Sequence, residues 1–198
     1  MKLLIATRNY HKLAEIETLW QEPAVQLVSM RDYPQIPDVV EDGSTFLANA
    51  AKKAVTLARA SGLWALADDS GLEVAALGNA PGVYSARFAG EPANDAANMQ
   101  KLLQMLKPGM TRRAWFRCVI VLAKPEGDSD WVEGRCEGQI AEAPRGSHGF
   151  GYDPVFIPDG HDRTFAELGP AVKNAISHRS IALRLACEKW ATRFRAGV

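Results

Sequence analysis

Short apolar runs alternate with segments of helical spacing along the first third of the chain. Runs bounded by polar or turn residues predict strands at Lys2–Thr7, at Ala24–Val28 and, fully buried, at Trp64–Ala67. Between the last two, apolar residues recur at helical spacing over Thr45–Ala60, with Ser44 as the expected N-cap. Strands that alternate with helices predict an α/β fold.

The second half changes character, because strict alternation replaces continuous runs. Apolar or small residues occupy every second position of Ala114–Leu122 and Trp131–Ile140, which predicts half-exposed strands joined by a turn. Such a pair is antiparallel, so we expect a mixed sheet. Helices are predicted over Asn94–Leu106 and, in a short form, near Phe165. A final helix is indicated by an apolar stripe at Leu183, Cys187, Trp190 and Phe194.

The composition is that of a soluble globular protein, with 47% hydrophobic and 23% charged residues. Basic and acidic residues number 23 each, so no net positive field attracts nucleic acid or an anionic membrane. We expect neither partner, and no apolar segment is long enough to span a bilayer. Cys118, Cys136 and Cys187 lie far apart without zinc-binding spacing, which indicates reduced thiols and a cytoplasmic protein.

A polar loop, Arg8–Lys12, follows the first predicted strand and opens a helix. Backbone N–H groups and the helix dipole at such a start favour anions. Thr7, Asn9 and Lys12 add a hydroxyl, an amide and an ammonium group. The glycines of a Walker loop are missing, and the alternative is a capped helix start with a solvated lysine.

An acidic pair, Asp68 and Asp69, ends the third apolar run and precedes Ser70 and Gly71. These residues are turn formers, so we expect both carboxylates where a strand leaves the sheet. Ligands of open α/β sheets bind at that edge, and hard divalent cations prefer such oxygen ligands. The alternative is a surface turn in which the aspartates bond their own backbone.

A further carboxylate and adjacent lysines accompany the helix predicted over Thr45–Ala60. Glu41 lies just before the N-terminus of this helix, where a carboxylate is favoured in any case. Of Lys52 and Lys53, one faces solvent by default and the other could point into a cleft.

A glycine-rich segment, Pro144–Pro154, carries side chains that suit a flat ligand. Phe150 could stack on such a ligand, and Asp153 could accept hydrogen bonds from its edge. A β-turn with buried aromatic residues is the alternative.

The start of the final helix carries cations. Ser177 is the expected N-cap, which places His178 and Arg179 in the first turn. Cations there oppose the helix dipole, which favours a bound anion or an acidic partner.

These motifs, in this order, resemble the inosine/xanthosine triphosphate pyrophosphatases, enzymes that hydrolyse non-standard purine nucleotides to monophosphates. The resemblance covers nearly the whole chain. It rests on Ala6–Lys12, Asn49–Ala54, Ala67–Leu72, Pro81–Arg87, Phe150–Pro154 and Ser177–Arg179. It implies one nucleotide-pyrophosphatase domain over residues 1–198, with a mixed, elongated central sheet flanked by helices, two lobes with a cleft between them, and a homodimer.

The resemblance also implies roles for individual residues. Glu41 and Asp69 would hold one or more Mg²⁺ ions per subunit, and Asp69 would be the catalytic residue that activates water. The role of Asp68 stays open, and Arg8 departs from the glycine that several family members carry. The triphosphate would be bound by Thr7, Arg8, Asn9, Tyr10, His11, Lys12 and Lys53. The remaining substrate contacts would be Ser70, Phe150, Gly151, Tyr152, Asp153, Lys173, His178 and Arg179.

The implied reaction is Mg²⁺-dependent hydrolysis of ITP, dITP or XTP to the monophosphate and pyrophosphate, which removes these nucleotides before incorporation into DNA or RNA. Hydrogen-bond donors in the pocket would donate to a 6-oxo group and disfavour the 6-amino group of adenine. A pyrophosphatase for modified pyrimidine nucleotides is one alternative. A nucleotide sensor without turnover is another, although Glu41 and Asp69 would weaken triphosphate binding unless a metal is present.

Overall fold

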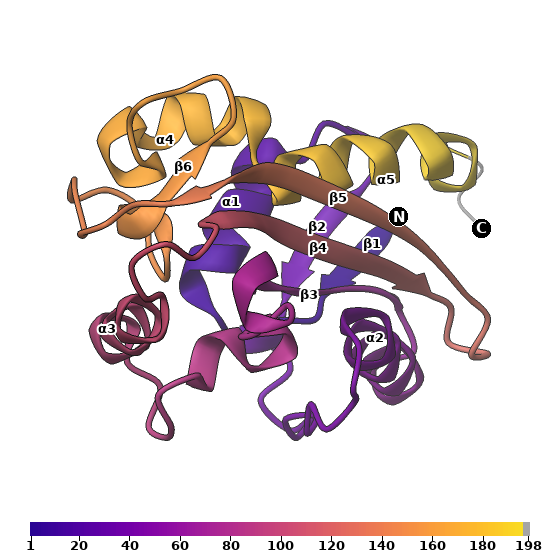
Figure 1. Ribbon diagram of the computed structural model, residues 1–198. Coiled ribbons are helices and arrows are strands. Elements are labelled where there is room, and N and C mark those ends of the chain that lie inside the picture. Colours follow the sequence, from indigo (N-terminus) through magenta and orange to yellow (C-terminus); the bar gives the residue numbers. More distant parts are fainter. Residues whose placement is uncertain (196–198) are drawn as a thin grey trace. The chain divides into compact units, whose positions relative to one another are not determined.

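The computed structural model describes residues 1–195, and its main feature is a mixed sheet with helices around it (Figure 1). The sheet has the strand order β2-β1-β3-β4-β5-β6 within the described residues. β1 pairs in parallel with β2 and β3, whereas β5 and β6 are antiparallel. The strands are β1 (Lys2–Ile5), β2 (Gln26–Ser29), β3 (Trp64–Val74), β4 (Arg113–Ala123), β5 (Ser129–Ile140) and β6 (Phe156–Pro158). The predicted mixed α/β sheet is therefore confirmed.

β4 and β5 form the predicted antiparallel pair. At one end the Lys124 N–H donates to the Asp128 carbonyl (2.8 Å), and at the other the Ile140 N–H donates to the Arg112 carbonyl (2.9 Å). β5 alternates between buried and more exposed residues along its length, as expected. The expectation of a half-exposed β4 is wrong over residues 118–123, because this part is buried on both faces and belongs to a core.

Capping explains where the helices begin. They are α1 (Tyr10–Leu19), α2 (Phe46–Ser61), α3 (Asp95–Met105), α4 (Phe165–Ile176) and α5 (His178–Arg195). The expected N-cap Ser44 is wrong by one position, since the Thr45 hydroxyl accepts the Ala48 N–H (3.1 Å) and starts α2. Ser177 caps α5 as predicted, because its hydroxyl accepts the Ser180 N–H (3.2 Å).

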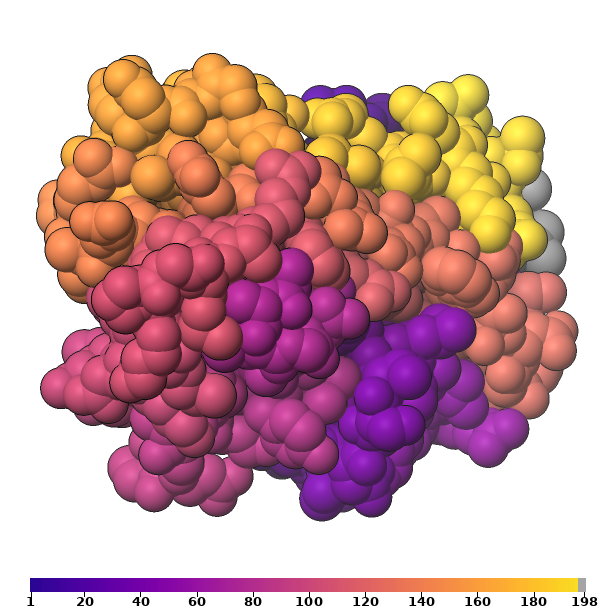
Figure 2. Space-filling model, viewed as in Figure 1, coloured from indigo at the N-terminus to yellow at the C-terminus, as the bar shows by residue number. Residues whose placement is uncertain are grey.

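Two helices differ in detail from their predictions. α4 is longer than the short helix expected near Phe165, and it kinks at Gly169 (φ 78°, ψ 177°) ahead of Pro170. In α5, Leu183, Trp190 and Phe194 are buried as expected, but Cys187 is only half-buried. Ala186 takes the inner position instead. The solvent side of this helix is the yellow surface in Figure 2. No helix within residues 1–195 is long and apolar enough to cross a membrane.

The chain divides into two compact units, and β3, β4 and β5 contribute residues to both. Unit 1 consists of Met1–Asp69, Cys118–Gly134 and the segment from Ile181 onward, and unit 2 of Ser70–Arg117 and Arg135–Ser180. Each unit has its own apolar cluster, which includes Trp190 in unit 1 and Phe156 in unit 2. The single functional domain over residues 1–198 and the cleft stay predictions.

β3 corrects the expectation of an acidic turn. The strand does not end before Asp68 but runs on to Val74, so the two aspartates lie inside it. Their side chains are only 1% and 6% exposed for Asp68 and Asp69. Both carboxylates have partners on helices of unit 1, so they do not need the backbone bonds that an Asx turn offers. Tertiary contacts thus override the local turn preference.

Candidate active site

The predicted site residues fall into two groups, one within each unit. The group in unit 1 contains the polar loop before α1, Glu41, Lys53 and the aspartates of β3. The group in unit 2 contains Ser70, the segment around Phe150, Lys173 and the start of α5. Each group is described on its own.

The polar loop in unit 1 is a capped helix start. The Asn9 Oδ1 atom accepts the N–H groups of His11 (3.0 Å) and Lys12 (3.2 Å), and the Asn9 N–H donates to the Thr7 hydroxyl oxygen (3.1 Å). Arg8 turns towards a neighbouring loop, where its guanidinium donates to the Ile36 carbonyl (2.9 Å) and pairs with an aspartate. Tyr10 is 62% exposed.

Two lysine side chains form ion pairs with acidic residues of unit 1. The Lys12 ammonium lies 3.0 Å from the Asp68 carboxylate, and the Lys53 ammonium lies 3.1 Å from the Glu41 carboxylate. Lys53 also donates to the Asp68 carbonyl (2.5 Å) and is only 7% exposed. Its neighbour Lys52 is exposed and pairs with Asp42 (2.6 Å), so the prediction that one of the two lysines faces solvent is confirmed. That Lys53 points into a cleft stays a prediction.

Asp69 lies beside these ion pairs and accepts a hydrogen bond from Asn49 Nδ2 (3.0 Å). Burial raises the pKa of Asp69 above its ordinary value, against the pull of Lys12, Lys53 and the Asn49 hydrogen bond; the negative charge of Glu41 adds to the rise. A carboxylate in this environment has a greater affinity for a proton or a metal ion than an exposed aspartate. Such perturbed groups are typical of functional sites.

The donor set fits Mg²⁺ held jointly with a phosphorylated ligand. Within residues 1–195 no cluster of three or more His, Cys, Asp or Glu side chains forms a metal cage. Mg²⁺ is ordinarily bound through one or two carboxylates, with phosphates and waters completing its shell. Glu41 and Asp69 supply two such carboxylates, and Glu41 acts electrostatically on Asp69.

The group in unit 2 centres on a buried ion pair beneath an aromatic ring. Asp153 accepts hydrogen bonds from Lys173 Nζ (2.6 Å) and from the Phe150 N–H (2.9 Å). The Lys173 ammonium lies 4.4 Å from the centre of the Phe150 ring, and the Arg179 guanidinium carbon lies 6.0 Å from it. This ring therefore has two cations close to it, and such an aromatic ring suits stacking with a flat ligand.

The first turn of α5 brings donors into the same group. Arg179 is 2% exposed and donates to the Ser70 hydroxyl oxygen (2.9 Å). His178 is 5% exposed, and its ring stacks on Phe116 with the centroids 4.7 Å apart. The sequence places the Arg179 cation at a helix N-terminus, where the dipole opposes its charge, so a ligand with acceptor oxygens would stabilise it.

Two predicted ligand contacts have structural bonds in unit 2. The Tyr152 hydroxyl donates to the Ser85 carbonyl (2.9 Å), and burial raises the pKa of this phenol, so it stays protonated. The Gly151 N–H donates to the Asp95 carboxylate (2.7 Å). These bonds fix the segment that carries Phe150.

Some residues that shape the two groups were missed by sequence reasoning. Asn49 contacts Asp69 directly, and Gly43 contacts Asn49. Gly149 has φ +80°, and a Cβ atom there would lie 2.0 Å from the Asp153 carboxylate. A buried asparagine four residues before Lys53, on the same helix face, was the available signal for Asn49.

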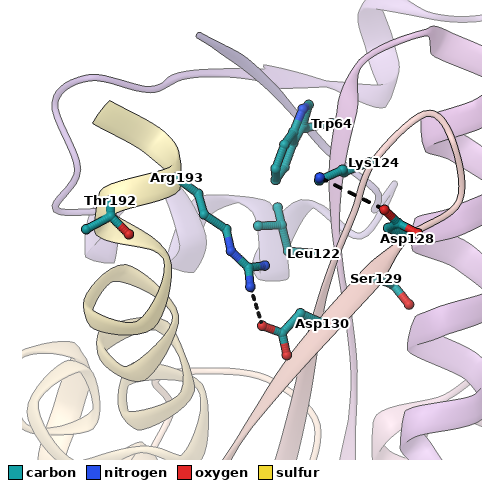
Figure 3. A pocket seen from close by; sticks show the side chains of 8 residues that line it. All are labelled: Trp64, Leu122, Lys124, Asp128, Ser129, Asp130, Thr192 and Arg193. Atoms are coloured by element: carbon teal, nitrogen blue, oxygen red, sulfur yellow. Dashed lines mark ion pairs between the residues drawn. The ribbon is translucent and has the colours of Figure 1, made fainter. Parts of the chain in front are cut away.

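A cavity of about 540 Å³ in unit 1 is lined by neither Glu41 nor Asp69 (Figure 3). None of the predicted site residues lines it. Inside it, Lys124 pairs with Asp128 and Arg193 with Asp130. The lining residues are Trp64, Leu122, Lys124, Asp128, Ser129, Asp130, Thr192 and Arg193.

The fold and the unit 1 group define an α/β protein with a buried carboxylate site next to lysines. The family model described as "Ham1 family" matches residues 3–189, so the chain belongs to this family. It is 51% identical over 184 residues to the dITP/XTP pyrophosphatase of Shouchella clausii, covering 92% of both chains. It is 52% identical over 190 residues to the enzyme of the same name from Desulforamulus reducens, covering 95% of this chain and 94% of the relative.

Solved structures agree with the fold. A HAM1 protein from Coxiella burnetii superposes with a TM-score of 0.90 at 44% identity, covering 97% of this chain and 99% of that one. A nucleoside-triphosphatase, also titled dITP/XTP pyrophosphatase, from Mycobacterium abscessus gives 0.79 at 47% identity, covering 94% and 98%.

Proposed function

We propose that this protein hydrolyses non-standard purine nucleoside triphosphates, namely ITP, dITP and XTP, to the monophosphate and pyrophosphate. The observation that carries the proposal is the buried Asp69, set among Lys12, Lys53 and Glu41, in a chain with relatives named dITP/XTP pyrophosphatase. The reaction would remove these nucleotides from the pool before polymerases incorporate them.

The unit 1 group would perform the chemistry. Glu41 and Asp69 would hold Mg²⁺, which when bound neutralises phosphate charge and lowers the pKa of bound water. Asp69 would orient the attacking water and accept its proton. The water oxygen forms a bond to the α-phosphorus while the bond from that phosphorus to the bridging oxygen breaks. Lys12 and Lys53 would stabilise the negative charge that develops on the departing pyrophosphate.

The unit 2 group would select the base. Phe150 would stack on the purine, and donors from His178, Arg179 and Lys173 would face the oxygens of hypoxanthine or xanthine. The 6-amino group of adenine cannot accept such bonds. Each buried donor left unpaired costs about 1–3 kcal/mol, so two mismatches discriminate by about 10²–10⁴-fold.

Mg²⁺ dependence, a homodimer and a cytoplasmic location belong to this proposal. The hard oxygen donors of Glu41 and Asp69 support the choice of Mg²⁺ over a softer metal. The even balance of 23 basic and 23 acidic residues supports a small-molecule substrate and not nucleic acid.

A product analysis across nucleotides tests the proposal. The purified protein is incubated with ITP, dITP, XTP, ATP, GTP and modified pyrimidine triphosphates, with and without Mg²⁺. We expect pyrophosphate and the monophosphate from the first three only, and only with Mg²⁺. Preferred turnover of a pyrimidine would favour the alternative specificity. Nucleotide binding without product in the presence of Mg²⁺ would favour the sensor.

A further inference from the structure

Asn49 joins two parts of unit 1 that carry the candidate metal ligands. It lies on the buried face of α2 and is 1% exposed. Its Oδ1 atom accepts the Gly43 N–H (2.7 Å), and its Nδ2 atom donates to the Asp69 carboxylate (3.0 Å). Gly43 lies two residues after Glu41. One side-chain amide therefore connects the Glu41 loop to β3.

The two bonds fix the orientation of the amide. Because a backbone N–H can only donate, the oxygen of Asn49 must face Gly43, and the NH₂ group must face Asp69. There is no space for a side chain at Gly43, since a Cβ atom there would lie 2.7 Å from Asn49 Oδ1 and 3.0 Å from the Ala48 Cβ atom. The loop therefore approaches α2 closely at this point.

A second residue of α2 spans the same two segments. Lys53 is one helical turn after Asn49, so both side chains project from the same face. Its ammonium contacts the Glu41 carboxylate (3.1 Å) and the Asp68 carbonyl (2.5 Å). When a substrate binds, its phosphates would compete with Glu41 for the Lys53 ammonium. The neutral amide of Asn49 is not attracted to a phosphate in this way and would keep its bonds. The fixed connection is therefore the one through Asn49.

We propose that Asn49 is a positioning residue that holds the carboxylates of Glu41 and Asp69 at the spacing needed for a shared divalent cation and for attack of water. The inference rests on the proposed function, and it assigns a task that Asn49 performs through its bonds to Asp69 and Gly43, without touching the substrate. A misplacement of about 1 Å at such a site typically costs about 10²-fold in rate.

Unit 2 offers a matched control in Asn98. This residue is also buried (2% exposed) on a helix, its Oδ1 accepts the Ala89 N–H (2.7 Å), and its Nδ2 donates to the Ala86 carbonyl (2.9 Å). It therefore also accepts one bond from a backbone N–H and donates one bond, in this case to a neutral carbonyl, and it contacts no candidate site residue through them. Asn49→Leu and Asn98→Leu remove equivalent hydrogen bonds at similar volume.

The experiment measures kcat and KM for ITP, the Tm, and the affinity for Mn²⁺ alone by the paramagnetic resonance signal of the free ion. For Asn49→Leu we expect kcat to fall about 10²-fold with KM changed less than about threefold, and Mn²⁺ to bind about tenfold more weakly. Asn98→Leu should lower the Tm by a similar amount and leave kcat, KM and the Mn²⁺ affinity unchanged. Gly43→Ala, which displaces the same amide from the other side, should repeat the Asn49→Leu pattern in milder form.

The proposal would be overturned if Asn49→Leu kept its activity and its Mn²⁺ affinity within threefold of the values for the unmodified protein. Parallel losses in Asn49→Leu and Asn98→Leu that follow Tm alone would overturn it as well, because they indicate a purely structural role. If the unmodified protein releases no pyrophosphate from ITP, the proposed function fails. The Mn²⁺ titrations then decide the positioning role by themselves.

Discussion

Two acidic regions of unit 1 look alike in composition and differ in physical character. Asp69 is buried, has two lysines nearby and has a raised pKa because burial opposes its charge. Asp130, at the cavity of Figure 3, is also buried in part, but bonds from Lys189 Nζ (2.6 Å) and Trp190 Nε1 (3.0 Å) outweigh the burial and hold its pKa at about 2.

The difference agrees with the proposed role of the Asp69 group in chemistry and with a role of Asp130 in stability. Asp130 has as many donors as its oxygens can use, including the Arg193 guanidinium at 3.1 Å, so its charge is fully compensated within the fold. The ionised form of Asp69 is less stable in the fold than in water, so a metal ion or a proton would improve its environment. Carboxylates with pKa values perturbed in this way cluster at functional sites.

The largest expected effect is that of Asp69→Asn. The variant cannot accept a proton and is a poorer metal ligand, so kcat for ITP should fall about 10²–10⁴-fold. Nucleotide binding, measured by calorimetry, should persist because the lysines remain. Asp130→Asn is the control, and its kcat should stay within threefold. Near-normal turnover by Asp69→Asn would exclude it as the key group.

Next in size is the contrast between adjacent lysines. Lys53→Met removes the cation that contacts Glu41 and the Asp68 carbonyl, and kcat/KM should fall about 10²-fold. Lys52→Met breaks only an exposed ion pair with Asp42 and should leave kcat/KM unchanged. Steady-state assays of both variants measure this contrast. Equal effects of the two substitutions would contradict the assignment of Lys53.

A smaller effect is expected in unit 2, where binding and not chemistry should change. Phe150→Ala removes the ring beside Lys173 and Arg179. Loss of stacking should raise KM for ITP about tenfold while kcat changes less than threefold. Steady-state kinetics with ITP and ATP check this expectation. A fall in kcat without a change in KM would place Phe150 in the chemistry instead.

The smallest effect concerns stability at acid pH. The folded-state pKa of Asp130 lies at about 2, below its ordinary value of 3.8, so its ionised form stabilises the fold. That contribution is present above pH 3.8 and is lost as pH falls towards 2. The Tm should therefore drop more steeply between pH 4 and 2 in the unmodified protein than in Asp130→Asn. Parallel curves from scanning calorimetry would refute the role of this carboxylate.

The sequence predicted the mixed α/β sheet, because it follows from periodicity and local pattern. It also predicted that one of Lys52 and Lys53 faces solvent, but the pattern did not say which of them is buried. It failed at Asp68 and Asp69, where residues that favour turns lie inside a strand. The cause is tertiary: the partners Lys12 and Asn49 are distant in sequence, and no local rule reveals them. Asn49 was missed for a related reason, since its position one helical turn before Lys53 was the available signal but does not reveal its contact with Asp69.

The central claim is that the Asp69 group directs water to the α-phosphorus. Hydrolysis of ITP in water enriched in ¹⁸O, followed by mass spectrometry of both products, tests it most directly. Attack at the α-phosphorus predicts one labelled oxygen in the monophosphate and none in the pyrophosphate. Label in the pyrophosphate, or release of orthophosphate as the first product, would contradict the account.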